Sequence, residues 1–186
     1  MSCDMSEWDG PLHLSDVEER PACLLVLNYG ALRIDKLGQI VTPSQVKNRP
    51  TIQWEGMDPK KLYTVIFTDP DVPSRDNCHL GQWHHYLVVN VKGNDLSSGC
   101  TLTEYVGVGA AKGTGHHRYT WLVYEQTTEL KCNEQVLSNR KAEGREKFNA
   151  AKFRKKYKLH SPAAGICFLG EWDESVLDLY KQLGVE

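Results

Sequence analysis

Two short stretches of the chain place side chains capable of chemistry close together. "TDPDVPS" (68–74) carries Asp69 and Asp71 on a proline-rich segment, and "QWHHYLVVN" (82–90) places His84 and His85 at the start of an apolar run. Paired carboxylates near imidazoles could hold a metal, act as acid and base, or line an anion pocket. Asp-Pro-Asp is also ordinary turn chemistry before a strand, so the residue types alone leave four interpretations open.

Strand alternation limits what the histidine pair can do. In a regular strand Trp83, His85, Leu87 and Val89 share one face, so His84 points to the other and the pair cannot chelate as one unit. Asp69 and Asp71, also two apart, point the same way if the segment is extended. The prolines indicate a rigid loop that leaves a strand.

A glycine-rich segment, "YVGVGAAKGTGHHRY" (105–119), supplies a third element. Gly107 and Gly109 allow backbone amides to approach a ligand, and His117 follows at the start of another predicted strand. The segment lacks the G-K-[ST] ending of a phosphate-binding P-loop and the helix that should follow. We expect the aspartates, His85 and this loop to meet at one rim of a sheet.

The chemistry of that rim is then a choice between a metal set and an anion pocket. Asp69, Asp71, His85 and His117 could bind zinc or iron, but no motif such as H-E-x-x-H is present, and no nucleophile marks a reaction. A carboxylate raises the pKa of a neighbouring imidazole and makes it a better donor. Carboxylates, imidazoles and backbone amides together would suit a phosphate that carries an amine, such as phosphoethanolamine.

The elements that must position these residues are mostly strands. Runs rich in β-branched and aromatic residues occur without alternating long helices, which predicts a mostly β fold with a two-sheet, antiparallel-rich β-sandwich core and peripheral helices. Helices are expected from Ser15 with Glu18 as a capping box, over 145–157, and at the C-terminal end after Asp173. The predicted strands are 23–29, 62–69, 84–92, 118–126 and 164–172.

Composition suits one domain spanning 1–186. A net charge of −2 offers no general attraction for nucleic acid. The six cysteines form no C-x-x-C pair and the N-terminal residues do not resemble a signal peptide, so we expect a cytoplasmic protein with reduced thiols.

The motifs "TDPDVPS", "QWHHYLVVN", "KGND", "GTGHHRYTWLVYEQ" and "FRKKY" together resemble the phosphatidylethanolamine-binding protein family, over almost the whole chain. The resemblance implies a two-sheet β core, a cis Val72–Pro73 bond and a small anion cavity at one rim. Carried over by motif, the expected ligand-binding residues are Asp69, Asp71, Pro73, Trp83, His85, Gly107, Gly109, His117, Tyr119 and Tyr180.

The resemblance also implies binding rather than catalysis, with no cofactor. Expected ligands are phosphatidylethanolamine or other phosphate-bearing head groups and nucleotides, and an expected partner is a Raf-type kinase, whose signalling the protein would inhibit. Contact with a membrane would be peripheral. The alternatives are a serine protease inhibitor acting by surface contact and a metal-dependent hydrolase.

Four positions depart from the family pattern. Ala110 and Ala111 stand where prolines are common, Gln82 replaces a glutamate of mammalian members, and Lys152 stands where those members carry a phosphorylated serine. A lysine cannot carry that phosphate. The dense basic patch, expected to meet anionic lipid or an acidic partner, is Lys152, Arg154, Lys155, Lys156 and Lys158.

Overall fold

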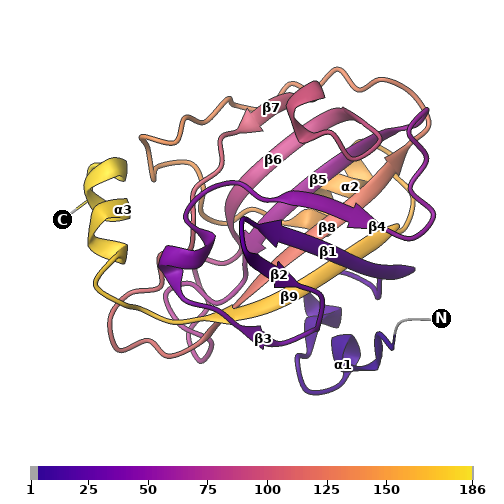
Figure 1. Cartoon of the computed structure of the whole chain (residues 1–186). Coiled ribbons are helices and arrows are strands. Elements are labelled where there is room, and N and C mark those ends of the chain that lie inside the picture. Colours follow the sequence, from indigo (N-terminus) through magenta and orange to yellow (C-terminus); the bar gives the residue numbers. More distant parts are fainter. Residues whose placement is uncertain (1–3, 186) are drawn as a thin grey trace.

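The structure of the protein is a computed structural model that describes residues 4–185. Nine strands dominate it (Figure 1). The strands are β1 (Cys23–Tyr29), β2 (Leu32–Ile34), β3 (Gln39–Ile40), β4 (Thr51–Trp54), β5 (Leu62–Asp69), β6 (Trp83–Lys92), β7 (Cys100–Thr103), β8 (His117–Gln126) and β9 (Ala164–Gly170). The helices are α1 (Ser6–Asp9), α2 (Ala150–Lys156) and α3 (Val176–Leu183), with short 3-10 turns at Leu14–Asp16, Pro43–Val46 and Leu96–Ser98.

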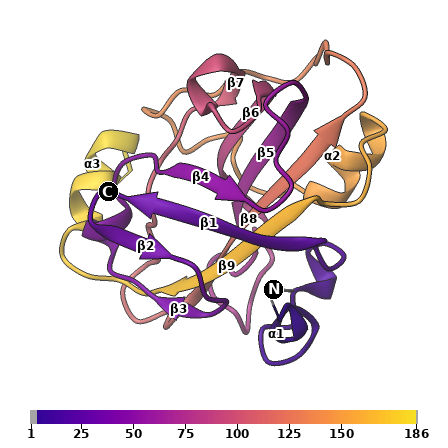
Figure 2. The same cartoon turned by 45° about the vertical axis from the view of Figure 1, so that its right-hand side comes forward.

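The strands form a large and a small sheet that share β1. The hydrogen-bonded order runs β2-β1-β9-β8-β5-β6-β7, with β4 on β1 and β3 on β9. β1 pairs with β9 only at Cys23 and Leu24, then leaves the large sheet to pair with β4 and β2. The small sheet therefore lies over the large one, as Figure 2 shows. The predicted two-sheet core is confirmed, with β1 and β3 parallel to β9 and the remaining pairs antiparallel.

Both faces of the large sheet are covered, so its central strands are buried almost throughout. Between the two sheets, aromatic rings stack around Phe67, whose ring centroid lies 4.6 Å from that of Trp121. The other face packs against the N-terminal segment and α2, with Trp8 and Phe153 among the buried residues. Burial on both faces explains why these strands have near-continuous apolar runs and why the five predicted ranges match within two residues.

The predicted helix over 145–157 is wrong in its first part. The chain is irregular up to Asn149, whose side chain accepts from the amide of Lys152 and caps α2 at Ala150. Lys147 lies at φ 58, a conformation that a helix cannot include. Arg145, the first residue of the predicted range, lies before the helix and is fully buried.

The other two helix predictions need smaller corrections. Asp173 does not cap α3: its carboxylate accepts from Ser175, and the helix begins at Val176. Glu18 forms no capping box; it is buried and accepts from Tyr124 and Arg154, which ties α2 to the sheet.

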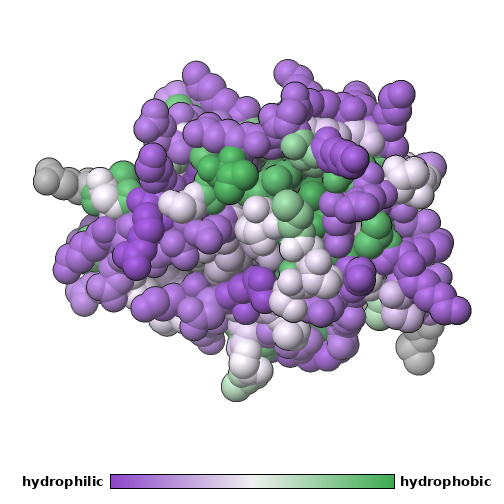
Figure 3. Space-filling view, turned by 90° about the horizontal axis from the view of Figure 1, so that it is seen from above, coloured by the Kyte–Doolittle hydropathy of each residue, from purple (hydrophilic) through white to green (hydrophobic). Residues whose placement is uncertain are grey.

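The surface seen from above is mostly hydrophilic around a central hydrophobic area (Figure 3). Within residues 4–185, no helix is both long enough and apolar enough to span a bilayer. The described cysteines form no disulfide.

Candidate functional site

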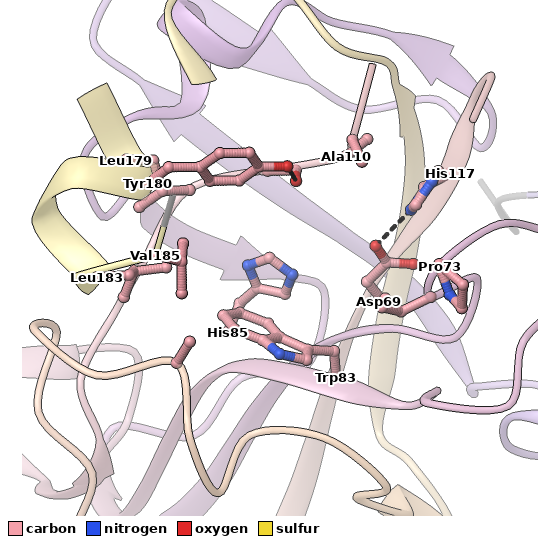
Figure 4. Close-up of a pocket in the computed structure, with 14 residues that line it drawn as sticks. Asp69, Pro73, Trp83, His85, Ala110, His117, Leu179, Tyr180, Leu183 and Val185 are labelled. Atoms are coloured by element: carbon pink, nitrogen blue, oxygen red, sulfur yellow. Dashed lines mark hydrogen bonds and ion pairs between the residues drawn. The ribbon is translucent and has the colours of Figure 1, made fainter. Parts of the chain in front are cut away.

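A cavity of about 390 Å³ opens at the rim where β5 ends and β6 and β8 begin, and α3 forms its opposite wall (Figure 4). This volume is at the small end of the range for small-molecule sites, roughly 300–1,000 Å³. The lining residues are Asp69, Val72, Pro73, Trp83, His85, Gly109, Ala110, Ala111, His117, Ala142, Leu179, Tyr180, Leu183 and Val185.

His84 and His85 point to opposite faces, as predicted. His84 stacks on Phe148 with ring centroids 4.4 Å apart, whereas His85 lines the cavity. The predicted grouping of His85 with Leu87 and Val89 is wrong, because the β5–β6 register shifts between Phe67 and Thr68. This bulge leaves one residue of β6 unpaired, so His85 faces the inter-sheet core while Leu87 and Val89 face the opposite one.

His85 is held in one tautomer. Its Nδ1 lies 3.2 Å from the carbonyl oxygen of Val106 and 2.9 Å from that of Gly107, and carbonyls only accept, so Nδ1 carries the hydrogen. Burial lowers the pKa of His85 to about 3, and the nearby Arg145 cation acts in the same direction. The imidazole is therefore neutral at physiological pH, and its Nε2 is an acceptor.

Asp69 and His117 form a buried pair at the other side of the cavity. Asp69 Oδ2 is 2.7 Å from His117 Nδ1. Thr114 donates its hydroxyl hydrogen to the carbonyl of Ala111, so its oxygen accepts from His117 Nε2. Burial opposes the charged form of His117, but the hydrogen bond and charge of Asp69 outweigh it and raise the pKa of His117. Burial also raises the pKa of Asp69, against the hydrogen bond and charge of His117. The pair therefore carries no net charge, with one proton shared along its hydrogen bond.

Asp71 lies behind the cavity wall rather than in it. Its carboxylate is fully buried and accepts from the Arg118 guanidinium at 2.8 and 3.0 Å, and from the Arg118 amide at 2.9 Å. Arg118 also donates to the carbonyls of Leu12 and His13. This pair fastens the loop after β5 to β8 and to the N-terminal segment.

The structure brings together most of the expected site residues, but not all. Three expected residues lie outside the lining: Asp71, Gly107 and Tyr119. The carbonyl of Gly107 accepts a hydrogen bond from His85 Nδ1. Tyr119 is buried, with its ring centroid 5.6 Å from that of His85. The expected residues that do line the cavity are Asp69, Pro73, Trp83, His85, Gly109, His117 and Tyr180.

The metal interpretation has no support from the positions of its donors. Asp71 is bound by Arg118, and no three His, Cys, Asp or Glu side chains in the described part of the chain are grouped to hold a metal ion. The set of Asp69, Asp71, His85 and His117 is thus not one ligand sphere.

Sequence reasoning missed Arg145, a buried cation next to the site. Its guanidinium donates to backbone carbonyls, including those of His84 and His85, and lies 5.3 Å from the centre of the Trp83 ring. No carboxylate within residues 4–185 forms an ion pair with it. A single arginine in a basic stretch resembles any surface arginine, so no sequence signal identified it.

The apolar wall was also missed, although its signal was present. Leu179 and Leu183 follow each other by one turn of α3, in the helix that the sequence predicts after Asp173. The helix lays these side chains over the cavity (Figure 4). Tyr180 fixes its position by donating to the carbonyl of Gly109 at 2.9 Å.

Tyr180→Phe should loosen this wall modestly. Removing one hydrogen bond is expected to cost about 0.5–1.5 kcal/mol of unfolding free energy. Amide hydrogen exchange in α3 should accelerate more than that of β8. Leu177→Ala, a half-exposed position on the same helix, is the control; equal exchange in Tyr180→Phe and the wild type would show that this bond does not hold the helix.

The departures from the family pattern fall at different distances from the cavity. Ala110 and Ala111 line it. Gln82 does not: its side-chain oxygen accepts from the first amide of α2. Lys152 is exposed on α2. In the basic patch, Arg154 pairs with Glu18 and Lys156 with Glu134, so the cations with no such partner in the described chain are Lys152, Lys155 and Lys158.

Comparisons with known proteins agree with this geometry. Residues 28–165 match the family described as "PBP: Phosphatidylethanolamine-binding protein". A Drosophila melanogaster protein named "Putative odorant-binding protein A5" is 38% identical over 167 residues, which are 90% of this chain and 79% of that protein.

Solved structures show the same fold at low sequence identity. The carboxypeptidase Y inhibitor, solved with its cognate proteinase, has a TM-score of 0.74 at 21% identity, over 91% of this chain and 95% of that one. The phosphatidylethanolamine-binding protein from Plasmodium vivax has a TM-score of 0.68 at 18% identity, over 91% and 98% of the two chains.

Proposed function

Since the chain belongs to the phosphatidylethanolamine-binding protein family, we propose that it is a binding protein whose cavity holds the polar head of a small amphipathic ligand. The candidate ligands are phosphatidylethanolamine, other phosphate-bearing head groups and nucleotides. Its output would be regulatory, through the surface around the occupied cavity. The proposed location is the cytoplasm.

The observation that carries the proposal is the division of the cavity into polar and apolar sides. Asp69, His117 and His85 supply its buried polar groups, and α3 covers them with Leu179 and Leu183. An opening of this size fits a head group and a short part of its chain, with any longer acyl chain outside. Binding of anionic lipid surfaces would rest on Lys152, Lys155 and Lys158, which favours at most a peripheral contact.

Asp69→Asn tests the role of the cavity in binding. The amide cannot balance the His117 imidazolium, so the buried polar side loses its paired charges. We expect phosphoethanolamine affinity to fall about tenfold or more, equivalent to about 1.4 kcal/mol, while circular dichroism still reports a folded domain. The measurement is an NMR titration of the histidine ring signals.

The matched control is Asp35→Asn, which removes a carboxylate that pairs with Arg33 on the exposed surface. This variant should bind phosphoethanolamine like the wild type. Equal affinity in Asp69→Asn would remove Asp69 from the site, and an absence of any histidine response in the wild type would refute headgroup binding.

The regulated partner is proposed as a Raf-type kinase, and a serine protease is the second candidate. The protease is favoured by one observation, the fold shared with an inhibitor that was solved on its proteinase. Assays of kinase and carboxypeptidase inhibition, each with the free protein and with phosphoethanolamine added, separate the two. If neither the kinase nor the carboxypeptidase were inhibited, the protein would bind its ligand but lack the proposed regulatory output.

A further inference from the structure

Arg145 is a fully buried cation whose partners carry no negative charge. In the described chain no carboxylate reaches ion-pair distance of its guanidinium. The nearby Glu104 carboxylate is exposed and accepts from the amide of Asn139. A buried ion without a counter-ion is costly, so an anion that approaches it is stabilised. The guanidinium donates, over distances between 2.9 and 3.3 Å, to the backbone carbonyls of Lys141, His84, His85, Glu104 and Ser138.

This cation lies one layer of side chains behind the cavity wall. Arg145 does not line the cavity, but its Nη1 is 3.3 Å from the carbonyl oxygen of His85, and its guanidinium carbon is 5.3 Å from the centre of the Trp83 ring. The rings of His85 and Trp83 line the cavity side by side, with centroids 4.6 Å apart (Figure 4). The charge of Arg145 contributes, after burial, to the lowered pKa of His85, so its field reaches the lining.

The other titratable groups around the cavity leave no net charge. Asp69 and His117 share one proton, and behind the wall Asp71 is paired with Arg118. The remaining groups are neutral, because burial lowers the pKa of the imidazole and raises the pKa values of the phenols. These groups are His85, Tyr119 and Tyr180. The Arg145 cation is therefore the charge next to the cavity that nothing balances.

Neutral hydrogen-bond donors are present at the cavity, but they supply no charge. The indole of Trp83 and the backbone at 109–111 can donate to ligand oxygens, whereas no lysine or arginine side chain belongs to the described lining. Such donors serve a charged and an uncharged ligand of the same shape alike. On the opposite side, Leu179 and Leu183 of α3 limit the water beside a ligand, and a charge acts more strongly where water does not screen it. Discrimination between an anion and a neutral ligand is thus left to Arg145.

We infer that Arg145 sets the charge selectivity of the cavity, as the counter-ion of an anionic ligand group that it does not touch. The inference rests on the proposed function and deepens it, because it assigns the preference for an anion to one residue. The favoured group is a compact oxyanion, a chemistry that phosphate and sulfonate share. Its oxygens accept from the neutral donors of the lining, and its charge is balanced through the wall formed by Trp83 and His85.

Two probes of nearly equal size and shape test the effect of charge alone. Ethanesulfonate is an anion at neutral pH, and ethanesulfonamide is uncharged. Each is titrated into the full-length protein while the ring signals of His85 and His117 and the Nε signal of Arg145 are recorded by NMR. We expect the sulfonate to bind about tenfold more tightly than the sulfonamide, because only the sulfonate balances the buried cation. The Arg145 Nε signal should move with the sulfonate and stay in place with the sulfonamide.

Three variants assign the selectivity to the charge of Arg145. Arg145→Gln should bring the two affinities close together, and Arg145→Lys, which keeps the charge, should retain most of their ratio. A merely structural role would weaken both probes equally and leave the ratio unchanged. Arg140→Gln makes the same change of net charge at an exposed position of the same loop, where solvent screens it, and should keep the wild-type ratio. If Arg145→Gln does not fold, the wild-type ratio and the Arg145 Nε signal still decide.

The outcomes separate this inference from the proposed function. Equal affinities of the two probes for the wild type, or an unchanged ratio in folded Arg145→Gln, would overturn the role of Arg145. Binding of phosphoethanolamine without binding of ethanesulfonate would also overturn it. In each of these cases the proposed function stands if phosphoethanolamine moves the histidine signals. If neither phosphoethanolamine nor ethanesulfonate moved them, both would fall.

Discussion

Asp71→Ala is expected to destabilise the protein by about 3–5 kcal/mol, because it leaves the Arg118 guanidinium buried without its counter-ion. Asp71 is fully buried and accepts both from the guanidinium and from the Arg118 backbone amide. The carbonyls of Leu12 and His13 still face Arg118 in the variant, but they carry no negative charge. Urea unfolding followed by tryptophan fluorescence measures the loss.

A second carboxylate on the same arginine provides the control. Asp16 lies 3.7 Å from the Arg118 guanidinium, and its side chain is 68% exposed. Solvent-exposed ion pairs contribute about 0–1 kcal/mol, so Asp16→Ala should be close to the wild type. If the two variants lost similar free energy, the Asp71–Arg118 pair would not be what fastens the loop after β5.

Acid is expected to unfold the protein progressively below pH 6.5, because two buried histidines must become charged. Burial lowers the pKa of His84 to about 4 and that of His85 to about 3. The ordinary histidine value is near 6.5, so between pH 6.5 and about 4 the unfolded chain binds protons that the folded chain does not. Their stabilising contribution is complete above pH 6.5 and is lost as pH falls.

The expected change of unfolding free energy with pH follows from proton linkage. Each histidine contributes at most about 1.4 kcal/mol per pH unit, so the pair gives up to roughly 3 kcal/mol per unit near pH 5. His117 does not add to this slope, since its raised pKa keeps it protonated in both states there. The free energy of urea unfolding measured at pH 7, 6 and 5 tests the expectation.

Single substitutions show which histidine causes the pH dependence of the unfolding free energy. His84→Gln should remove about half of it, whereas His79→Gln, at an exposed position, should leave it unchanged. A stability that stays flat from pH 7 to pH 5 in the wild type would contradict the neutral state of His84 and His85.

The positions of the strands could be predicted because composition and alternation are local properties. β1 and β5 have the predicted bounds, and His84 is separated from His85 as the period of two requires. The bulge in β6 depends on pairing with β5, which no local pattern encodes. It reversed the expected faces of Leu87 and Val89 without affecting the recognition of His85 as a site residue.

The ion pairs were not predictable for a different reason. Asp71 and Arg118 are 47 positions apart, and either residue alone is compatible with a surface loop. Their pairing removes Asp71 from the cavity and leaves Asp69 as the carboxylate there. Arg145 is similar: only the fold shows that five backbone carbonyls, two of them in β6, accept from its guanidinium. Residue types indicated the site, but the partner of each charge determined its role.

The place of β9 in the sheet also bears on how the protein is made. This strand lies between β8 and β1, yet it follows every other strand along the chain. Cys23 at the start of β1 contacts Ala163 across 140 positions. During synthesis, β8 and β1 therefore present unpaired edges until residues 164–170 leave the ribosome. Such long-range pairing slows folding and exposes strands to aggregation, so the nascent chain should depend on chaperones late in translation.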